Sequence, residues 1–506
     1  MMRRAGPIII ISLLLGLVFD WFFYDKASGI TVFIFTSLVL GFTYLLAHKF
    51  KHPLNKSIYW LTPVTLFFSL MLFVRANGFL AFMNILLTMY LLIMIARLAH
   101  QPSLRLGQFK IFQYVSLLGA GPLSFVREFF SFLRRVFSNR NNNNPKSSFW
   151  PIVRGVILSL PILFIFLMLL SSADLVFKGY IEVLFSPSIS FETIFRLFQI
   201  GFVTSLFMGA YALIFMPASP PAVNPGMVKK GFDLGTTEAS IILGSVGALF
   251  FVFVTVQLAY LFGGTDQIVS TGYTYAEYAR KGFFELITVA ALTMGLILTG
   301  QNDIKHRTLL QTLFFKWLCG VLIAEVLIIM LSAHMRLSLY EEAYGFTMLR
   351  LLSHLFILWL AVAFSLLLLH IIKGNSAKRF AFQLFISLLC FFAVINIINP
   401  DDYIAWKNIK RFNEVGKLDQ NHLLTLSADA VPRIAELLDH PNKKVQNSTA
   451  KILYYKKGYS QKEKDYVTGW QTTNLSRQRA NKIYSENAEQ IEAAKDYDYY
   501  QELNIN

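Results

Sequence analysis

The sequence predicts an all-α fold, a polytopic membrane bundle of about eleven transmembrane helices followed by a small, mostly helical C-terminal segment. Apolar runs of roughly 18 to 25 residues recur along the first four hundred positions, and each is long enough to cross about 30 Å of hydrocarbon. Hydrophobic residues make up 55% of the chain and charged residues 15%, which is too apolar for a string of soluble domains. No such run occurs in residues 400 to 506.

Four regions follow from the positions of the apolar runs. They are an N-terminal four-helix membrane segment (1–100), a basic amphipathic cytoplasmic segment with an Asn-rich linker (101–150), a main bundle of about seven helices (151–399) and a soluble helical C-terminal segment (400–506). The predicted spans are 7–24, 29–47, 57–75, 78–97, 151–173, 193–216, 238–262, 275–299, 309–333, 347–372 and 378–398, with Pro63 interrupting the third.

The loops between these spans predict an orientation. Lys and Arg gather in alternate loops, as they do on the cytoplasmic side of membrane proteins, and this places the N-terminus in the cytoplasm. An odd number of crossings then places the C-terminal segment outside. In that segment, Ser427 is expected to cap a helix with Asp429 in its first turn, and "LLDHPNKKVQNSTAKIL" resembles one helical hairpin of the HEAT-repeat kind.

Composition and motifs exclude several functions. The formal charge of +16 lies almost entirely in residues 1–399, so we attribute it to the positive-inside rule and expect no nucleic-acid partner. Cys319 and Cys390 fall inside apolar runs without metal-ligand spacing. Walker, HExxH and GxSxG motifs are absent, so we assign no catalytic residue, cofactor or metal. His334 and His354, twenty residues apart, are interpreted as interfacial side chains.

The stretch "TYAEYARKGFFEL" (274–286) places ionisable groups at the start of an apolar helix. Glu277, Lys281 and Glu285 recur every four residues and therefore share one helix face, with Tyr278 alongside, whereas Arg280 points elsewhere. A charge in lipid or in a protein interior costs several kcal/mol unless it is paired or neutralised. The stretch is therefore predicted to belong to a polar site inside the bundle.

Other spans carry the same anomaly. A purely structural role, as salt bridges or as side chains that reach the headgroups, is the alternative for residues near span ends, such as Arg75, Arg196 and Arg350. Glu285 and Glu325 lie deeper, where a carboxylate needs a partner or a task. The candidate polar intramembrane site comprises Asp20, Asp174, Glu277, Tyr278, Arg280, Lys281, Glu285, Glu325 and Arg350.

Five stretches together resemble a known family. They are "QLAYLFGG" (257–264), "TYAEYARKGFFEL" (274–286), "LYEEAYGFTMLR" (339–350), "INPDDYIAWKNIKRF" (398–412) and "LSADAVP" (426–432). In this order they resemble bacterial multi-pass membrane proteins that are catalogued only as a domain of unknown function. The resemblance covers most of residues 150 to 440 and implies a bacterial inner-membrane location. It implies no activity, substrate or catalytic residue.

Three functions remain open from the sequence. The pattern favours a non-enzymatic protein that binds a small or lipid-like ligand in an outward-facing site, for transport or sensing. The first alternative is a membrane-embedded enzyme acting on a lipid-linked substrate, with Glu285 or Glu325 as general base. The second is a scaffold or signalling partner that works through its C-terminal segment. The bilayer is the one partner expected in each case, and the oligomeric state stays open.

Overall fold

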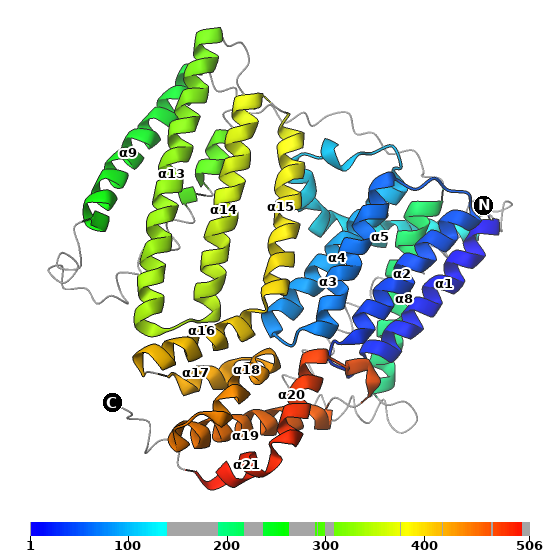
Figure 1. Cartoon of the computed structure of the whole chain (residues 1–506). Helices are drawn as coiled ribbons and strands as arrows, with labels where there is room; N and C mark the ends of the chain where they lie inside the picture. The colour runs from blue at the N-terminus through cyan, green and yellow to red at the C-terminus, as the bar shows by residue number, and fades with distance from the viewer. Residues whose placement is uncertain are drawn as a thin grey trace, which may run out of the picture. The chain divides into compact units, whose positions relative to one another are not determined.

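The computed structural model describes residues 2–138, 191–216, 236–262, 289–290, 292–298, 308–374, 376–416, 418–466 and 469–497. Within them every regular element is a helix, as the sequence predicts (Figure 1). The chain divides into two compact units. Unit 1 comprises Met1–Leu106, Phe112–Pro221 and Gln461–Leu475, and unit 2 comprises Gly107–Ile111, Ala222–Ser460 and Ser476–Asn506.

Eight helices in the described residues are long and apolar enough to cross a bilayer, and each coincides with a predicted span. The chain is a multi-pass helical membrane protein. The predicted span 151–173 and most of 275–299 lie outside the described residues, while 238–262 falls on α9 (Thr236–Phe262), which has a shorter apolar stretch. The eight are α1 (Met2–Phe23), α2 (Ile30–Lys49), α3 (Lys56–Val74), α4 (Gly78–His100), α8 (Phe191–Phe215), α13 (Leu309–Tyr344), α14 (Met348–Lys373) and α15 (Ala377–Ile398).

One predicted helix end differs clearly from the structure. The third predicted span recurs as α3, which runs through Pro63 as one helix. The ninth span is predicted to end at residue 333, whereas α13 continues to Tyr344. Hydropathy falls after residue 333, but the following residues contain neither Pro nor Gly and favour a helix. The helix ends only at Gly345, which has φ +80°.

Close helix packing in unit 1 depends on glycine. A Cβ on Gly16 of α1 would lie 2.1 Å from Thr204 Oγ1 and 2.9 Å from the Ile200 carbonyl oxygen, both on α8. A Cβ on Gly209 would lie 1.9 Å from the carbonyl oxygen of Phe125 on α5 (Ile111–Ser138). Small residues at such crossings allow the backbones of membrane helices to approach closely. Gly16 and Gly209 therefore allow α8 to lie close to α1 and α5.

Residues 469–474, which we call the strap, complete unit 1. The Thr31 hydroxyl donates to the Gln471 carbonyl oxygen at 3.2 Å, and the Ile30 amide donates to the Thr473 carbonyl oxygen at 3.1 Å. Asn474 Nδ2 donates to the carbonyl oxygens of Leu72 at 3.0 Å and Arg75 at 2.7 Å. The strap thus satisfies backbone groups at the α1–α2 and α3–α4 turns, where helix ends otherwise leave them unpaired.

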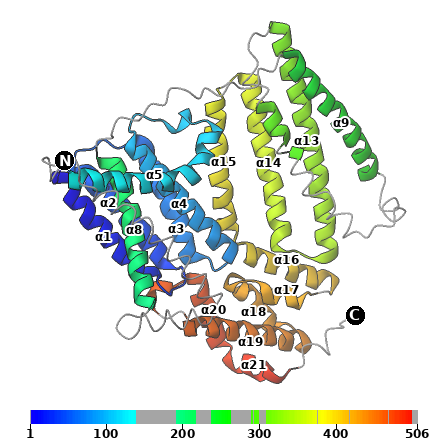
Figure 2. The same ribbon diagram turned by 180° about the vertical axis from the view of Figure 1, so that it is seen from behind.

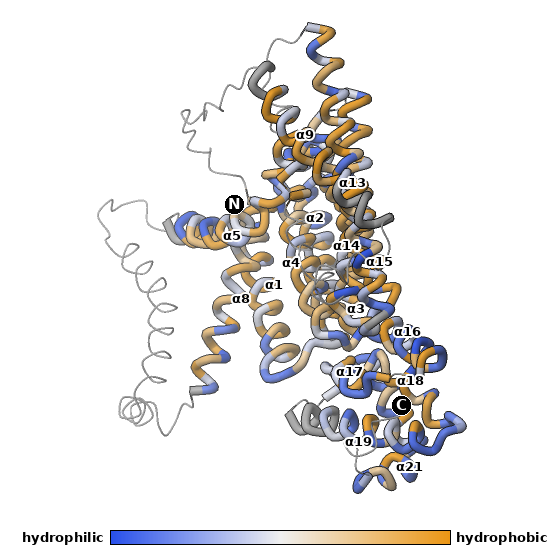
Figure 3. Tube along the Cα trace, turned by 90° about the vertical axis from the view of Figure 1, so that its left-hand side faces the viewer, coloured by the Kyte–Doolittle hydropathy of each residue, from blue (hydrophilic) through white to orange (hydrophobic). Residues whose placement is uncertain are grey.

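Unit 2 has a membrane core and a second core beyond the helix ends. Buried aliphatic and aromatic side chains of α9, α13, α14 and the start of α15 form the first, including Phe315, Leu322, Phe364 and Phe380. Figure 3 shows these long helices to be mainly hydrophobic, whereas the C-terminal helices are mixed. The second core joins the start of α14, through Leu351, to the C-terminal helices.

The C-terminal helices begin with a sharp corner. Asn399 has φ +57° and ends α15, and Pro400 occupies the first turn of α16 (Pro400–Val415), where its missing amide proton costs nothing. Seen from front and back, α16 runs across the ends of α13, α14 and α15 (Figures 1 and 2). We call α16 and the unit 2 helices that follow it the C-terminal module: α17 (Gln420–Thr425), α18 (Val431–Ala435), α19 (Lys443–Tyr466, as far as Ser460), α20 (Leu475–Glu486, from Ser476) and α21 (Ala488–Ala493).

The predicted Ser427 cap is present in this module. Ser427 Oγ accepts a hydrogen bond from the Asp429 amide at 3.2 Å and caps the short 3₁₀ helix Ala428–Ala430, which leads into α18. A second 3₁₀ helix, Glu436–Asp439, follows α18, and α19 comes after it. Side chains of both segments, Ile434 and Leu438 before the connection and Ala450 and Leu453 after it, share one hydrophobic core.

Candidate functional site

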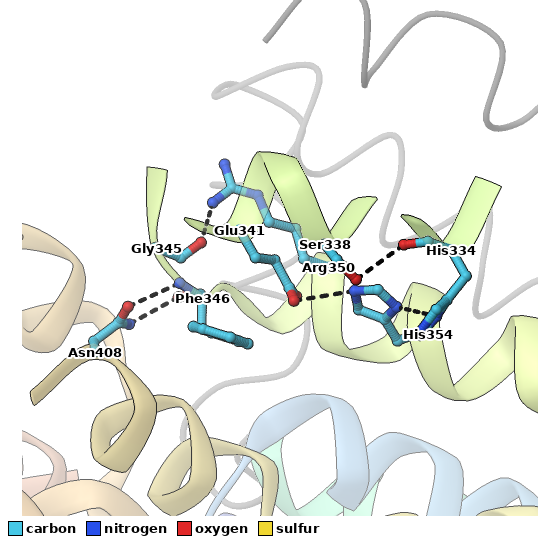
Figure 4. Close-up of polar contacts among 8 residues, drawn as sticks. All are labelled: His334, Ser338, Glu341, Gly345, Phe346, Arg350, His354 and Asn408. Atoms are coloured by element: carbon cyan, nitrogen blue, oxygen red, sulfur yellow. Dashed lines mark hydrogen bonds and ion pairs between the residues drawn. The ribbon is translucent and has the colours of Figure 1, made fainter. Parts of the chain in front are cut away.

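Three of the five motif stretches meet where α13 turns into α14. Residues 339–350 span the turn between the two helices, residues 398–412 cover most of α16, and residues 426–432 lead into α18. Figure 4 shows the polar contacts around the turn. Of the other two stretches, 274–286 lies outside the described residues and 257–264 does so in part.

Asn408 of α16 holds the turn through both atoms of its side-chain amide. Asn408 Oδ1 accepts from the Phe346 amide at 2.8 Å, and Nδ2 donates to the Phe346 carbonyl oxygen at 2.8 Å (Figure 4). Gly345 is required beside it, because a Cβ there would lie 2.8 Å from Oδ1 and the φ of +80° disfavours any other residue. The turn and α16 therefore behave as one locked element.

Two arginines strengthen this element. Arg350 NH1 donates to the Gly345 carbonyl oxygen, and its guanidinium lies 4.0 Å from the centroid of the Tyr340 ring. Arg411 Nε donates to the Glu342 carbonyl oxygen at 2.9 Å. Both cations thus bind carbonyl groups at the C-terminal end of α13, where the helix dipole favours positive charge. Arg350, predicted as a ligand residue, has a structural contact here.

A chain of three ionisable groups connects α13 and α14 next to the turn. His354 Nε2 lies 3.0 Å from Glu341 Oε2, and His354 Nδ1 lies 2.7 Å from His334 Nδ1 (Figure 4). With Glu341 ionised and both imidazoles neutral, His354 donates from Nε2 to the carboxylate and accepts from His334 at Nδ1. Glu341 is buried and His334 is exposed. The arrangement connects a buried carboxylate to an exposed imidazole.

Glu341 retains unused bonding capacity. Its second oxygen, Oε1, is buried and has no hydrogen-bond partner among the described residues. A carboxylate oxygen in that position costs free energy unless something binds it or the group becomes protonated. The described residues contain no group of three or more His, Cys, Asp or Glu side chains arranged to hold a metal ion. The hydrogen bonds from Glu341 through His354 to His334 form a continuous path along which a proton can move.

The sequence alone leads us to interpret His334 and His354 as interfacial residues, although their spacing about the turn indicates that they lie close together. Each lies about ten residues from the turn, so in an antiparallel helical hairpin they come to the same height. Glu341 lies seven residues after His334, which places both on one face of α13. Because the span is predicted to end at residue 333, His334 and Glu341 fall outside the predicted helix, and the spacing does not show that they face His354.

A second polar group lies inside the C-terminal module. Asp401 Oδ2 accepts from the Ser427 amide at 2.9 Å, while Asp429 accepts from the hydroxyls of Ser427 and Ser476. Both carboxylates are 3% exposed. Hydrogen bonds from donors fixed in the module satisfy these carboxylate oxygens, and this joins α16, the segment before α18, and α20. These acids are accounted for by structure.

Lys456 of α19 is a buried cation in the same module. Its ammonium donates to the carbonyl oxygens of Leu424, at 3.1 Å, and Leu426. Burial lowers the pKa of Lys456 to about 8, an effect that the nearby Asp401 carboxylate partly offsets. Lys456 therefore satisfies carbonyl groups that the chain leaves unpaired between α17 and α18.

The other predicted site residues fall in different places. Asp20 belongs to unit 1, where Arg196 NH2 donates to its Oδ2 at 2.6 Å, so an ion pair connects α1 and α8. Glu325 belongs to unit 2, near the middle of α13. The remaining members, Asp174, Glu277, Tyr278, Arg280, Lys281 and Glu285, lie outside the described residues.

Glu325 is a buried carboxylate without a hydrogen bond at one oxygen. It is 6% exposed, and its Oε2 has no partner among the described residues. A Cβ on Gly247 of α9 would lie 3.8 Å from that oxygen, which places Glu325 against α9. Its position on the helix is about half a turn away from His334 and Glu341, which face α14. α13 thus carries two separate ionisable sites.

Comparisons with known proteins identify a family. A family model described as a domain of unknown function (DUF4153) matches residues 62–437. A search of curated proteins and a search of solved structures return no match.

Proposed function

The chain belongs to the DUF4153 family, and from this premise we propose that it binds a small or lipid-like ligand in a polar site within the membrane, for transport or sensing. The observation that carries the proposal is the buried carboxylate of Glu325 in the α13 span, with an unbonded oxygen among the described residues. An ionisable group at such a depth is costly, and a bundle keeps it for a partner, a proton or a ligand.

The proposed site also includes polar residues that the sequence groups on one helix face. Glu277, Lys281 and Glu285, with Arg280 on the same helix, would supply charges of both signs. Arg350 would contribute at the end of the spans, where its guanidinium already binds the Gly345 carbonyl oxygen. Mixed charges suit a ligand with both an anionic and a cationic or hydrogen-bonding group.

The proposal places the site on the extracytoplasmic side of a bacterial inner membrane, with a cytoplasmic N-terminus. The distribution of Lys and Arg between alternate loops supports this orientation. Labelling of a cysteine introduced at His440 with a membrane-impermeant reagent in intact cells tests it. Modification without cell lysis supports an external C-terminal module, whereas modification only after lysis overturns the orientation.

Accessibility of the α9–α13 interface tests the site itself. In a variant with Cys319 and Cys390 replaced by Ala, Gly247→Cys places a thiol next to Glu325, and Leu249→Cys places one on the exposed side of α9. Methanethiosulfonate reagents modify thiolates, which form only where water reaches. We expect the impermeant reagent to modify Gly247→Cys in the intact membrane and to leave Leu249→Cys unmodified.

A positive control makes a negative result informative. Asn413→Cys, exposed on α16, must react under the same conditions. If it reacts and Gly247→Cys does not, the interface is dry and the proposed site fails there. Adding Glu285→Gln or Arg280→Ala to Gly247→Cys should change the labelling rate while the amount of protein in the membrane stays constant. Loss of folded protein in both variants would instead indicate structural salt bridges.

One observation favours a second function, a membrane-embedded enzyme acting on a lipid-linked substrate. A carboxylate and an imidazole in hydrogen-bond contact, Glu341 and His354, orient a ring that can relay a proton to His334. Reconstituted protein given a polyprenyl-diphosphate-linked sugar should then hydrolyse the sugar–phosphate bond, with water as the nucleophile and its proton passing to the His354–His334 pair. His354→Gln should abolish release of the sugar, while Ser338→Ala preserves it. Absence of release by the unmodified protein rejects this function.

A further inference from the structure

The outer face of α16 has an unusual composition. Tyr403, Trp406, Lys407 and Lys410 follow the spacing i, i+3, i+4, i+7 and therefore form one stripe along the helix. Trp406 is 40% exposed and the Lys410 side chain is 57% exposed, whereas Lys407 and Tyr403 are half-buried and Tyr403 also packs against the core of the C-terminal module. We call these four residues the outer face of α16.

The opposite face of the same helix is fully used by the protein. Ile404 and Ala405 are buried in the core of the C-terminal module, and Ile409 packs with Leu437 and Val445. Asn408 binds the backbone of the α13–α14 turn. The helix is thus fixed in rotation, so its outer face is held in one direction.

The position of α16 is set by the spans that it follows. α15 ends at Ile398, and only Asn399 separates it from α16, so the helix starts at the level where a membrane span ends. Lys407 lies 5.5 Å from the centroid of the Phe346 ring in the α13–α14 turn, at the end of two further spans. The outer face therefore lies at the height of a membrane surface.

The side chains of the outer face combine aromatic rings with cations. The Lys407 ammonium lies 5.1 Å from the Trp406 ring and 5.7 Å from the Tyr403 ring. Tryptophan and tyrosine are enriched at the level of lipid headgroups, and nearby Lys residues attract anionic lipids. Glu414 contacts Lys410 in a 3.9 Å pair between exposed side chains, which contributes little, and Asp402 on the same helix lies 3.5 Å from Arg433.

We propose that the outer face of α16 binds anionic phospholipid headgroups. In this arrangement Lys407 and Lys410 contact lipid phosphates, while Trp406 and Tyr403 lie among the glycerol groups. The contact fixes the C-terminal module, through α16, to the surface of the same bilayer that its neighbouring spans cross. Local anionic lipid then affects the α13–α14 turn, because Asn408 and Arg411 of the same helix hold that turn.

Quenching of Trp406 by brominated lipids tests this proposal on the full chain. The protein is placed in phosphatidylcholine nanodiscs that contain about a third phosphatidylglycerol, with bromine near the carbonyl end of one lipid class at a time. The difference between the unmodified protein and Trp406→Phe isolates the signal of this residue from the other tryptophans of the chain. We expect brominated phosphatidylglycerol to quench Trp406 about twofold more than brominated phosphatidylcholine at equal content.

Matched charge variants complete the test. Lys407→Gln with Lys410→Gln should remove the preference for phosphatidylglycerol, whereas Lys443→Gln with Lys444→Gln, an equal charge change on exposed residues of α19, should retain it. Equal quenching by both lipids in the unmodified protein overturns the anionic preference. Absence of quenching by either lipid shows that the face does not reach the bilayer, which also overturns the proposal.

Discussion

Replacing Asn408 with Ala removes both hydrogen bonds that hold the α13–α14 turn. The Phe346 amide and carbonyl lose their partners at 2.8 Å each, and Asn408 itself is 8% exposed, so water does not readily replace the amide. Two hydrogen bonds contribute about 2 kcal/mol, and leaving their partners unpaired raises the loss to about 4 kcal/mol. We expect the free energy needed to open the turn to fall by about 2 to 4 kcal/mol.

Hydrogen exchange measures this opening directly. The Phe346 amide exchanges only when its bond to Asn408 breaks, so the calculated loss corresponds to roughly 30- to 900-fold faster exchange at constant intrinsic rate. Peptides covering residues 342–350 of the full chain in nanodiscs report it. Asn413→Ala, an exposed position on the same helix, is the matched control and should leave the rate unchanged. Exchange at the unmodified rate in Asn408→Ala would refute the locked turn.

Three further predictions concern the glycine turn, the ion pair of unit 1 and the buried lysine. Gly345→Ala should open its own loop more than Gly374→Ala opens the loop after α14. Both glycines have positive φ, but only at Gly345 would a Cβ also meet a neighbouring side chain. Hydrogen exchange of the two loops compares them, and equal effects would contradict the steric account. Arg196→Met should lower the melting temperature, because it leaves the carboxylate of Asp20 unpaired. Adding Asp20→Asn to this variant should restore part of the loss. Additive losses in the double variant would exclude coupling between Asp20 and Arg196. Because the pKa of Lys456 is lowered, the folded state binds fewer protons than the unfolded state between about pH 8 and 10.5. The stability of the C-terminal module should therefore rise with pH across this window, by up to about 3 kcal/mol, and exchange rates of α17 peptides, corrected for pH, measure the rise. The same slope in Lys456→Met would disprove the assignment.

The membrane helices are the part of the fold that hydropathy alone predicts. Eight predicted spans recur as apolar helices, since burial in hydrocarbon requires a long apolar run whatever the tertiary contacts. The end of α13 could not be predicted in this way. Residues 334–344 are polar enough to leave the membrane yet remain helical, and the helix stops at Gly345, where Asn408 and Arg411 of α16 bind the turn.

The sequence predicts which ionisable residues lie in the apolar spans, but it does not predict which of them lie next to one another. Hydropathy shows that Asp20 and Glu325 are costly where they lie, but not which groups face them. Asp20 finds Arg196, 176 residues away in sequence, and only the packing of α1 on α8 brings the two together. The His334–His354–Glu341 chain depends on a hairpin whose turn the sequence locates only if α13 extends past the apolar run.

The strap has a consequence for biogenesis. Thr31 leaves the ribosome 440 residues before Gln471, its hydrogen-bond partner, so the earliest helices wait until synthesis is almost complete for their final contacts. A chain cut before residue 469 lacks Asn474 and exposes carbonyl groups at Leu72 and Arg75. Deleting residues 410–506 therefore damages the N-terminal helices as well as the C-terminal module. A deletion meant to reveal a signalling tail would instead yield an immature membrane protein, recognisable by its rapid degradation.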